Sequence, residues 1–216
     1  AVEPSFTEAW RTLTQDARAL RTLVAIGLGT FAFSMEDILL EPYGGEILGL
    51  SVSTTTMLTA TLACGGLIGF AWASRVLARG TCAYRMASWG ARVGVPAFVC
   101  VIAAAPLASV PLFGLGIFLI GLGGGLFAHG TLTATMQMAP PEQTGLAMGA
   151  WGAVQASAAG VGMALGGLLR DAVALGSSSL LGYSAVYGLE IVLLVLTLWA
   201  VRPLQQPTDQ VGPASL

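Results

Sequence analysis

Six long runs of apolar residues constrain the fold of this chain more than any other feature of its sequence. A run of about 20 apolar residues is long enough to cross the hydrocarbon core of a bilayer as a helix. Only 9% of the residues are charged, whereas a water-soluble domain carries about 25%. We therefore expect an all-α membrane protein with six transmembrane helices. The runs cover residues 22–41, 52–78, 84–105, 108–137, 143–170 and 181–202.

The distribution of arginine predicts how these spans are oriented. With an even number of spans, only Arg170 falls on one side of the membrane, where Asp171 is its neighbour. Loops that carry an excess of basic residues stay in the cytoplasm, so we expect both termini there. The net charge of −2 argues against a nucleic-acid partner. The arginines expected on the cytoplasmic side are Arg11, Arg18, Arg21, Arg75, Arg79, Arg85, Arg92 and Arg202.

The residues before the first span have a pattern of their own. Apolar residues recur on one helical face, and Ser5 with Glu8 fits a capping box. We expect an amphipathic lead helix over residues 1–21, lying in the cytoplasmic headgroup layer. The alternative is a short soluble linker helix packed on the domain. The six-helix domain would then cover residues 22–203, followed by a flexible cytoplasmic tail over residues 204–216.

Glycines one helical turn apart predict where the spans pack closely. Small residues at this spacing allow two helix backbones to approach each other in a membrane. We therefore expect helix interfaces at three pairs, namely Gly121 with Gly125, Gly145 with Gly149, and Gly162 with Gly166.

Three acidic residues at the end of the first run are unusual. On one helix, Asp37 and Glu41 would be like-charged i, i+4 neighbours, and all three acids would oppose the dipole at a helix C-terminus. Pro42 is expected to stop the helix, and Tyr43 suits a membrane interface. Candidates for binding a pigment or a partner are thus Glu36, Asp37, Glu41 and Tyr43, together with His129 and Arg92. The alternative is that all three lie in periplasmic water.

Three further ionisable residues fall within the apolar runs. His129 is the sole histidine, and it either ligates a metal such as the magnesium of a chlorin, relays a proton, or forms a structural hydrogen bond. Arg92 either extends to the cytoplasmic surface or pairs with an acid. Glu190 is expected at the interface. No arrangement typical of hydrolases is visible, so we do not expect an enzyme.

One family signature covers the acidic stretch. The segment FSMEDILLEPYGGEILGLS, together with EPSFTEAWRTL, GFAWASRVLARG and GLGGGLFAHGTLTATM, resembles the second half of PucC/LhaA-type proteins. These form the bacteriochlorophyll-delivery branch of the major facilitator superfamily. The resemblance implies half of a facilitator-type bundle, either as a fragment or as a natural half-protein, because the family has twelve spans. It also implies that the first and fourth spans line a central face, which would place Glu36, Asp37 and His129 on one surface.

The same resemblance implies a function. It points to an assembly factor for light-harvesting antenna complexes in the inner, intracytoplasmic membrane of photosynthetic bacteria. Bacteriochlorophyll would be the pigment delivered, with His129 as a ligand of its magnesium. Antenna polypeptides, the reaction centre and membrane lipids would be the partners. Two alternatives stay open, a stationary subunit bound to a reaction centre–antenna complex and half of a facilitator-type small-molecule transporter.

Overall fold

The computed structural model describes residues 15–206, and all regular structure within this range is helical. Six of its segments are long and apolar enough to cross a membrane. The predicted fold class, an all-α membrane protein with six spanning helices, is therefore confirmed. The segments are Ala17–Glu46, Val52–Leu77, Ala83–Ala104, Val110–Met138, Pro141–Gly176 and Ser179–Gln205.

Most of the predicted lead helix lies outside the described residues, as do its capping residues Ser5 and Glu8. Residues 17–21, which were assigned to it, form the first turns of the first spanning helix. Asp16 caps this helix by accepting a hydrogen bond from the backbone N–H of Arg18 at 2.9 Å. Of the predicted tail, residues 207–216 lie outside the described range, whereas Leu204 is buried.

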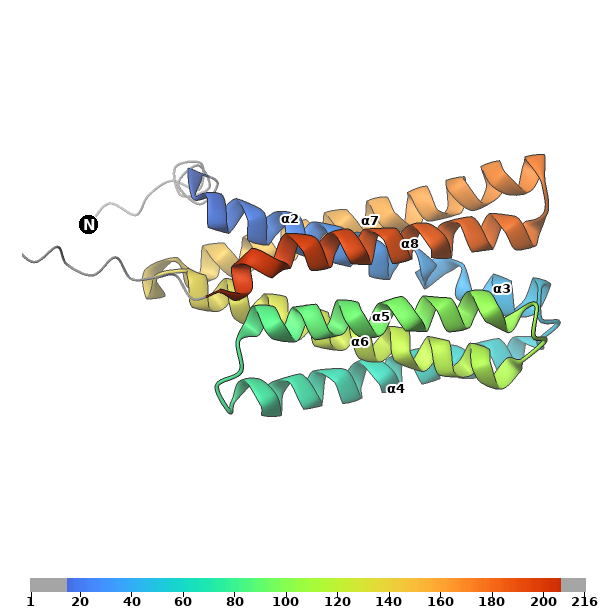
Figure 1. Ribbon diagram of the computed structural model, residues 1–216, viewed down its shortest axis with the longest axis horizontal. Coiled ribbons are helices and arrows are strands. Elements are labelled where there is room, and N and C mark those ends of the chain that lie inside the picture. The colour runs from blue at the N-terminus through green and yellow to red at the C-terminus, as the bar shows by residue number, and fades with distance from the viewer. Residues whose placement is uncertain (1–14, 207–216) are drawn as a thin grey trace, which may run out of the picture.

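The helices run back and forth along one long axis, and the described part of the chain begins and ends at the same end of the bundle (Figure 1). We call this the terminal end and the opposite one the distal end. α6 packs between α4 and α5, while α2, α7 and α8 pack against one another. The helices are α2 (Ala17–Ser34), α3 (Leu40–Glu46), α4 (Val52–Leu77), α5 (Ala83–Ala104), α6 (Val110–Met138), α7 (Thr144–Gly176) and α8 (Ser179–Val201), with 3₁₀ turns η1 (Glu36–Ile38), η2 (Pro141–Gln143) and η3 (Arg202–Gln205).

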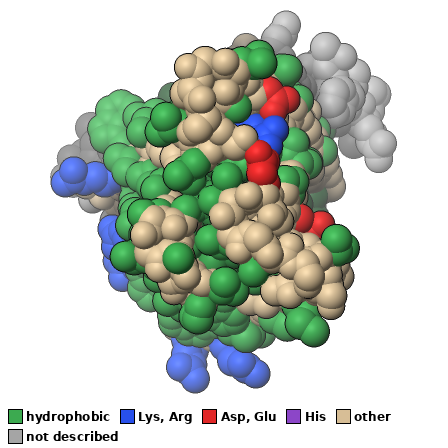
Figure 2. All heavy atoms as spheres, turned by 90° about the vertical axis from the view of Figure 1, so that its right-hand side faces the viewer, with side chains coloured by type: hydrophobic (Ala, Val, Ile, Leu, Met, Phe, Trp, Pro, Cys, Tyr) green, Lys and Arg blue, Asp and Glu red, His purple; other side chains and the backbone are tan. Residues whose placement is uncertain are grey.

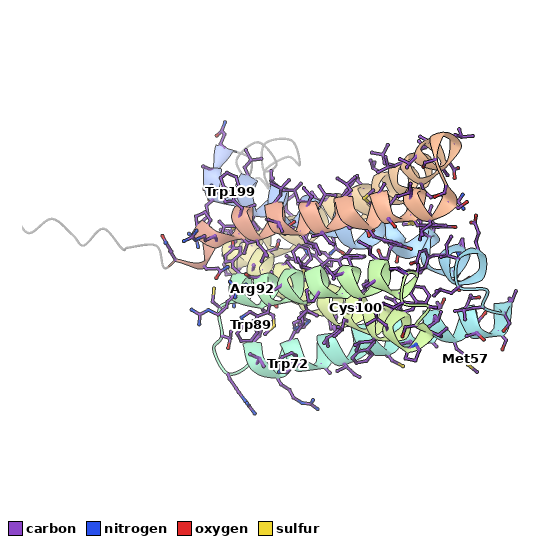
Figure 3. All side chains as sticks on the ribbon, turned by 45° about the vertical axis from the view of Figure 1, so that its right-hand side comes forward. Met57, Trp72, Trp89, Arg92, Cys100 and Trp199 are labelled. Carbon is purple, nitrogen blue, oxygen red and sulfur yellow. The ribbon has the colours of Figure 1, made fainter. Side chains whose placement is uncertain are left out.

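Tryptophan and arginine gather toward the terminal end. Trp72, Trp89 and Trp199 lie there together with Arg92 (Figure 3). The rings of Trp72 and Trp89 stack with their centroids 6.5 Å apart. Arg21 donates a hydrogen bond to the backbone carbonyl of Ala200 at 2.9 Å, which ties α2 to the last turn of α8. Such a belt of aromatic and basic residues is typical of a membrane–water interface.

The first spanning segment is broken, which the sequence did not predict. α2 ends at Ser34, the chain makes the short turn η1, and α3 then begins at Leu40. Pro42 therefore does not stop a helix, because it lies in the first turn of α3. A proline is tolerated there, since the first N–H groups of a helix have no partner within it. The segment EPYGGE, residues 41–46, is helical throughout.

The glycine pairs divide into packed and open ones. Gly121 and Gly125 lie directly against the backbone of α4, whose Gly65 and Gly69 lie against α6 in return. We call this contact the α4–α6 glycine seam. The prediction for Gly145 and Gly149 is wrong for the described chain, because a Cβ at either position would meet no atom within 4 Å. The remaining pair, Gly162 and Gly166, packs on α2 at the carbonyls of Phe31 and Met35.

Candidate functional site

A groove opens on the face of the bundle between α2, α6 and α7. It has a volume of about 450 Å³ and aromatic walls. Trp151 is held in place by a hydrogen bond from its Nε1 to the hydroxyl of Thr131, at 3.2 Å. The lining residues are Thr30, Phe33 and Ser34 from α2, Gly124, Phe127 and Ala128 from α6, and Trp151, Gly152, Gln155, Ala156 and Ala159 from α7.

The chemistry of the groove is apolar with a few polar groups. Gln155 contributes a side-chain amide to the groove. The hydroxyl of Thr30 is buried without a hydrogen-bond partner among the described residues. A concave apolar surface with a small number of fixed polar groups is typical of a site for an apolar ligand. The flat walls formed by Phe33, Phe127 and Trp151 suit a planar one. The groove residues therefore fit the edge of a macrocycle such as a bacteriochlorophyll.

The sequence analysis missed Trp151 and Gln155, the two groove residues that combine size with a polar group. Gln155 lies well inside the predicted span 143–170. An amide at that depth is costly unless it has a partner or a ligand, so its position was a usable signal. The shape of the groove could not be predicted from the sequence, because it depends on how α7 packs beside α2 and α6.

The three acids of the first span are separated in the structure. Glu36 is buried with 1% exposure, whereas Asp37 and Glu41 are exposed. Glu41 accepts a hydrogen bond from Thr59 of α4 and lies in the first turn of α3, where a negative charge is favourable. The expected repulsion at a helix C-terminus is therefore absent, because the helix breaks before these residues. The alternative that all three acids lie in water is wrong for Glu36.

The sequence suggested that Tyr43 lies at the membrane interface, but the structure places its side chain inside the bundle. It is completely buried, and its hydroxyl donates a hydrogen bond to the carbonyl of Val101 at 3.0 Å. Its ring packs against the rings of Phe113, Tyr183 and Tyr187, with centroids 5.2 to 5.5 Å apart. Tyr43 therefore fastens α3 to α5, α6 and α8.

Glu190 is not interfacial either. It lies in the middle of α8, is completely buried, and its two carboxyl oxygens have no hydrogen-bond partner. Its central position in the predicted span 181–202 was a signal that the sequence analysis did not use. The structure places it beside Glu36, close enough for their charges to interact.

His129 and Glu36 are not brought together on one surface. Gly29 of α2 packs against the ring of Phe127. From that level, Glu36 lies seven residues toward the distal end and His129 two residues toward the terminal end, which separates them by roughly 13 Å along the axis. His129 instead packs edge-on against Phe70 of α4, with ring centroids 4.5 Å apart. Its Nδ1 is buried without a partner.

Arg92 is exposed on the side of α5. Among the described residues, the ion pairs involve Arg170 alone, so Arg92 does not pair with an acid. Its position toward the terminal end agrees with an arginine that extends to the membrane surface (Figure 3).

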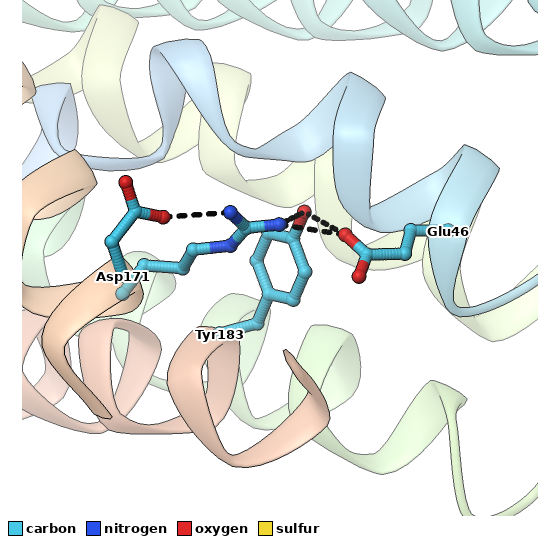
Figure 4. A network of polar contacts seen from close by, with 4 residues as sticks. Glu46, Asp171 and Tyr183 are labelled. Atoms are coloured by element: carbon cyan, nitrogen blue, oxygen red, sulfur yellow. Dashed lines mark hydrogen bonds and ion pairs between the residues drawn. The ribbon is translucent and has the colours of Figure 1, made fainter. Parts of the chain in front are cut away.

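A polar network joins three helices at the distal end (Figure 4). Arg170 of α7 contacts the carboxylates of Glu46 at 2.6 Å and Asp171 at 2.7 Å. It also donates to the hydroxyl of Tyr183 at 2.8 Å, and that hydroxyl donates to Glu46 at 2.9 Å. On the end face in Figure 2, basic and acidic side chains lie together within a largely apolar and neutral surface. The network fastens the end of α3 to α7 and α8.

Comparison with known proteins found one family model and several relatives that match this chain. A family model described as "PUCC protein" matches residues 1–208. The chain is 55% identical over 187 residues to Protein PucC of Rhodovulum sulfidophilum, covering 87% of this chain and 41% of the relative. It is 52% identical over 208 residues to Protein PucC of Cereibacter sphaeroides, covering 94% and 45%.

A more distant relative carries a different name. The chain is 26% identical over 198 residues to the Bacteriochlorophyll synthase 44.5 kDa chain of Rhodobacter capsulatus, which covers 89% of this chain and 46% of the relative. In all three comparisons the chain spans less than half the length of the relative.

Proposed function

Because this chain belongs to the PucC protein family, we propose that it acts as a membrane assembly factor for bacterial light-harvesting antenna complexes and handles bacteriochlorophyll. The observation that carries this proposal is the groove between α2, α6 and α7. It offers aromatic walls and an amide to a flat apolar molecule. In this proposal the chain binds and releases pigment without catalysing a reaction.

The antenna polypeptides are the proposed recipients of the pigment, and the reaction centre is a further partner. A groove open to the side lets a pigment leave toward a neighbouring transmembrane helix without passing through water. α7 borders the groove, and the glycines of its first half leave its surface flat. A flat helix surface suits the close approach of a single antenna helix.

The groove can be tested by filling it. Gly152 lines the groove and a Cβ there would meet no atom within 4 Å, so Gly152→Phe is expected to fold and to occupy the groove. We expect pigment binding, measured from the absorption spectrum of the protein purified with added bacteriochlorophyll, to fall at least about tenfold, or ~1.4 kcal/mol. The matched control is Gly160→Phe, an equally open position of the same helix outside the groove. Equal pigment binding by the two variants would refute the groove as the site.

His129 is a second candidate contact for the pigment. A neutral imidazole is a good magnesium ligand for a chlorin, and Nδ1 of His129 has no hydrogen-bond partner among residues 15–206. His129→Leu is expected to change the absorption maximum of bound pigment if the ring is a ligand. An unchanged spectrum would leave His129 as a packing partner of Phe70.

A stationary subunit of a reaction centre–antenna complex is the second proposed function. It is favoured by the uncovered apolar sides of α4 and α7, which include Leu67, Trp72 and Leu168. Membranes solubilised gently and separated by size would distinguish the two. An assembly factor is expected to migrate mostly free of mature complexes, whereas a subunit would be found with them in fixed proportion.

Half of a facilitator-type transporter is the third proposed function. The broken first span favours it, because discontinuous helices form many transport sites. Uptake of pigment precursors or other small molecules by the reconstituted protein tests it, and we expect none. A substrate that accumulates in the vesicles would replace the assembly proposal.

The proposed location is the photosynthetic inner membrane, with both termini in the cytoplasm. The concentration of arginine at the terminal end supports this orientation. Single cysteines placed in the loops 78–82 and 105–109 test it with a reagent that does not cross membranes. In intact cells we expect labelling of the second loop only.

A further inference from the structure

The two buried carboxyl groups of Glu36 and Glu190 lie in the middle of the bundle. Glu190 has 11 residues of α8 on each side, within Ser179–Val201. At 1.5 Å per residue it lies about 16 Å from either end of the helix, which corresponds to the middle of a bilayer. Glu36 lies beside it, and both side chains are at most 1% exposed.

No cation of the described chain faces this pair. The titratable side chains near it are Asp37 from η1 and Tyr187 from α8, and Tyr43 of α3 and Tyr183 of α8 lie next to Tyr187. The hydroxyls of Tyr43 and Tyr183 are engaged elsewhere, with Val101 and Glu46. Arg170, the ion-paired arginine of the distal end, is directed to Glu46 and Asp171.

Four polar atoms around the pair lack hydrogen-bond partners. They are Oε2 of Glu36, both carboxyl oxygens of Glu190, and the hydroxyl of the completely buried Tyr187. Two carboxylate charges at this depth would cost many kcal/mol, because no cation of the described residues offsets their desolvation and their repulsion. The charge must therefore be neutralised by something that the protein binds. Within residues 15–206, no group of three or more His, Cys, Asp or Glu residues forms a metal site.

The break in the first span lies at the same place. Glu36 is the first residue of the turn η1. An interruption of the regular α-helix at membrane depth is tolerated where it is covered by protein or reached by water, and discontinuous helices are a recurrent feature of ion and proton sites in membrane proteins. A buried, unpartnered acid pair and a broken helix are independent observations that indicate the same kind of site.

We propose that Glu36 and Glu190 form a proton-binding site, in which one carboxylic acid donates a hydrogen bond to the other carboxyl group and the hydroxyl of Tyr187 completes the pair. The bound ligand is a proton. Its release leaves two negative charges at membrane depth, so it requires water to enter at the break.

Infrared spectroscopy of the protein, purified in a detergent that has no carbonyl group, tests the bound proton. At neutral pH the exposed acids are ionised, so a C=O stretching band of a protonated carboxylic acid reports the buried pair. We expect this band in the wild type, with a shift in D₂O, and its loss in the double variant Glu36→Gln/Glu190→Gln. The control Glu142→Gln, an exposed acid in the α6–α7 connection, is expected to retain it. A wild type without the band would overturn the proposal, and this measurement needs no variant to fold.

The pH dependence of stability is the second test. A carboxyl group that keeps its proton when folded and loses it when unfolded makes the folded state less stable as pH rises. We therefore expect the wild type to lose thermal stability relative to the double glutamine variant between about pH 5 and about pH 8. The Glu142→Gln control should follow the wild type. Stability that depends on the concentration of sodium or potassium, and not on pH, would show a bound metal cation and overturn the proposal.

Discussion

α4 and α7 lie on opposite sides of the bundle (Figure 1) and carry the same kind of glycine pattern, but they use it differently. Gly65 and Gly69 of α4 lie against the backbone of α6 in the glycine seam. Gly145 and Gly149 of α7 meet no atom within 4 Å. The glycine pattern therefore identifies a helix face suited to close packing, but not the helix that packs on it.

α7 contains both situations along its own length. Its distal half packs on α2 through Gly162 and Gly166, whereas its first half borders the groove and leaves its glycines open. The packed half is thus a structural support and the open half an available surface. Substitutions of these glycines should therefore separate loss of folding from loss of function.

The largest effect is expected in the α4–α6 glycine seam. In Gly121→Val the added side chain would overlap the backbone carbonyl of Leu62, which cannot move without shifting α4. Overpacking of this kind costs about 3 kcal/mol or more when backbone is the obstacle. We expect little monodisperse protein in detergent by size-exclusion chromatography. If Gly121→Val folds with wild-type thermal stability, α4 does not depend on the seam.

A smaller loss is expected in the packed half of α7. In Gly162→Val the Cβ would lie 2.9 Å from the carbonyl oxygen of Phe31. α7 has a large uncovered surface and can shift outward more easily than α6, so we expect a loss of about 1–2 kcal/mol. Thermal unfolding in the same detergent measures it. A loss as large as that of Gly121→Val would mean that α7 is fixed as firmly as α6.

These contrasts mark the limit of what the sequence could provide. The pairs Gly121–Gly125 and Gly145–Gly149 have the same spacing in the sequence, and both lie in long apolar runs. The six spans were predictable because a bilayer fixes the length and polarity of each one separately. Which glycine face is covered depends on the placement of all six helices, and this is not a local property of the sequence.

The acids show the same limit. The break between α2 and α3 was not predictable, because the apolar run continues through it and Pro42 suggested a different end point. The sequence therefore predicted that Glu36, Asp37 and Glu41 lie on one helix. The proximity of Glu36 to Glu190 was not predictable, because the two residues are 154 positions apart along the chain. Among the groove residues, only Gln155 could have been recognised from the sequence, by its depth in the predicted span.

The third expected effect concerns the ion pairs that hold the packed half of α7 in place. Arg170→Gln removes the ion pairs with Glu46 and Asp171, all of which are partly exposed. Such pairs contribute about 1 kcal/mol or less, and salt screens them. We expect a small loss of thermal stability at low salt that disappears at high salt. Arg92→Gln, which removes an exposed and unpaired arginine, should show no such dependence.

The smallest effect on stability, with the largest consequence for the proposed function, is expected in the open half of α7. Gly149→Val should change the free energy of unfolding by no more than about 0.5 kcal/mol, because the new side chain contacts nothing and valine is no worse than glycine in a helix. If a partner helix packs on this face, the same substitution should strongly reduce antenna complex in membranes, measured by absorption in cells that carry the variant as their sole copy. Ala172→Val, at an exposed position in the distal half of α7, is the control and should support normal antenna levels. Because Gly149→Val is expected to leave the fold intact, a normal antenna level would exclude this face as a docking surface. The open face of α7 would then contact only lipid.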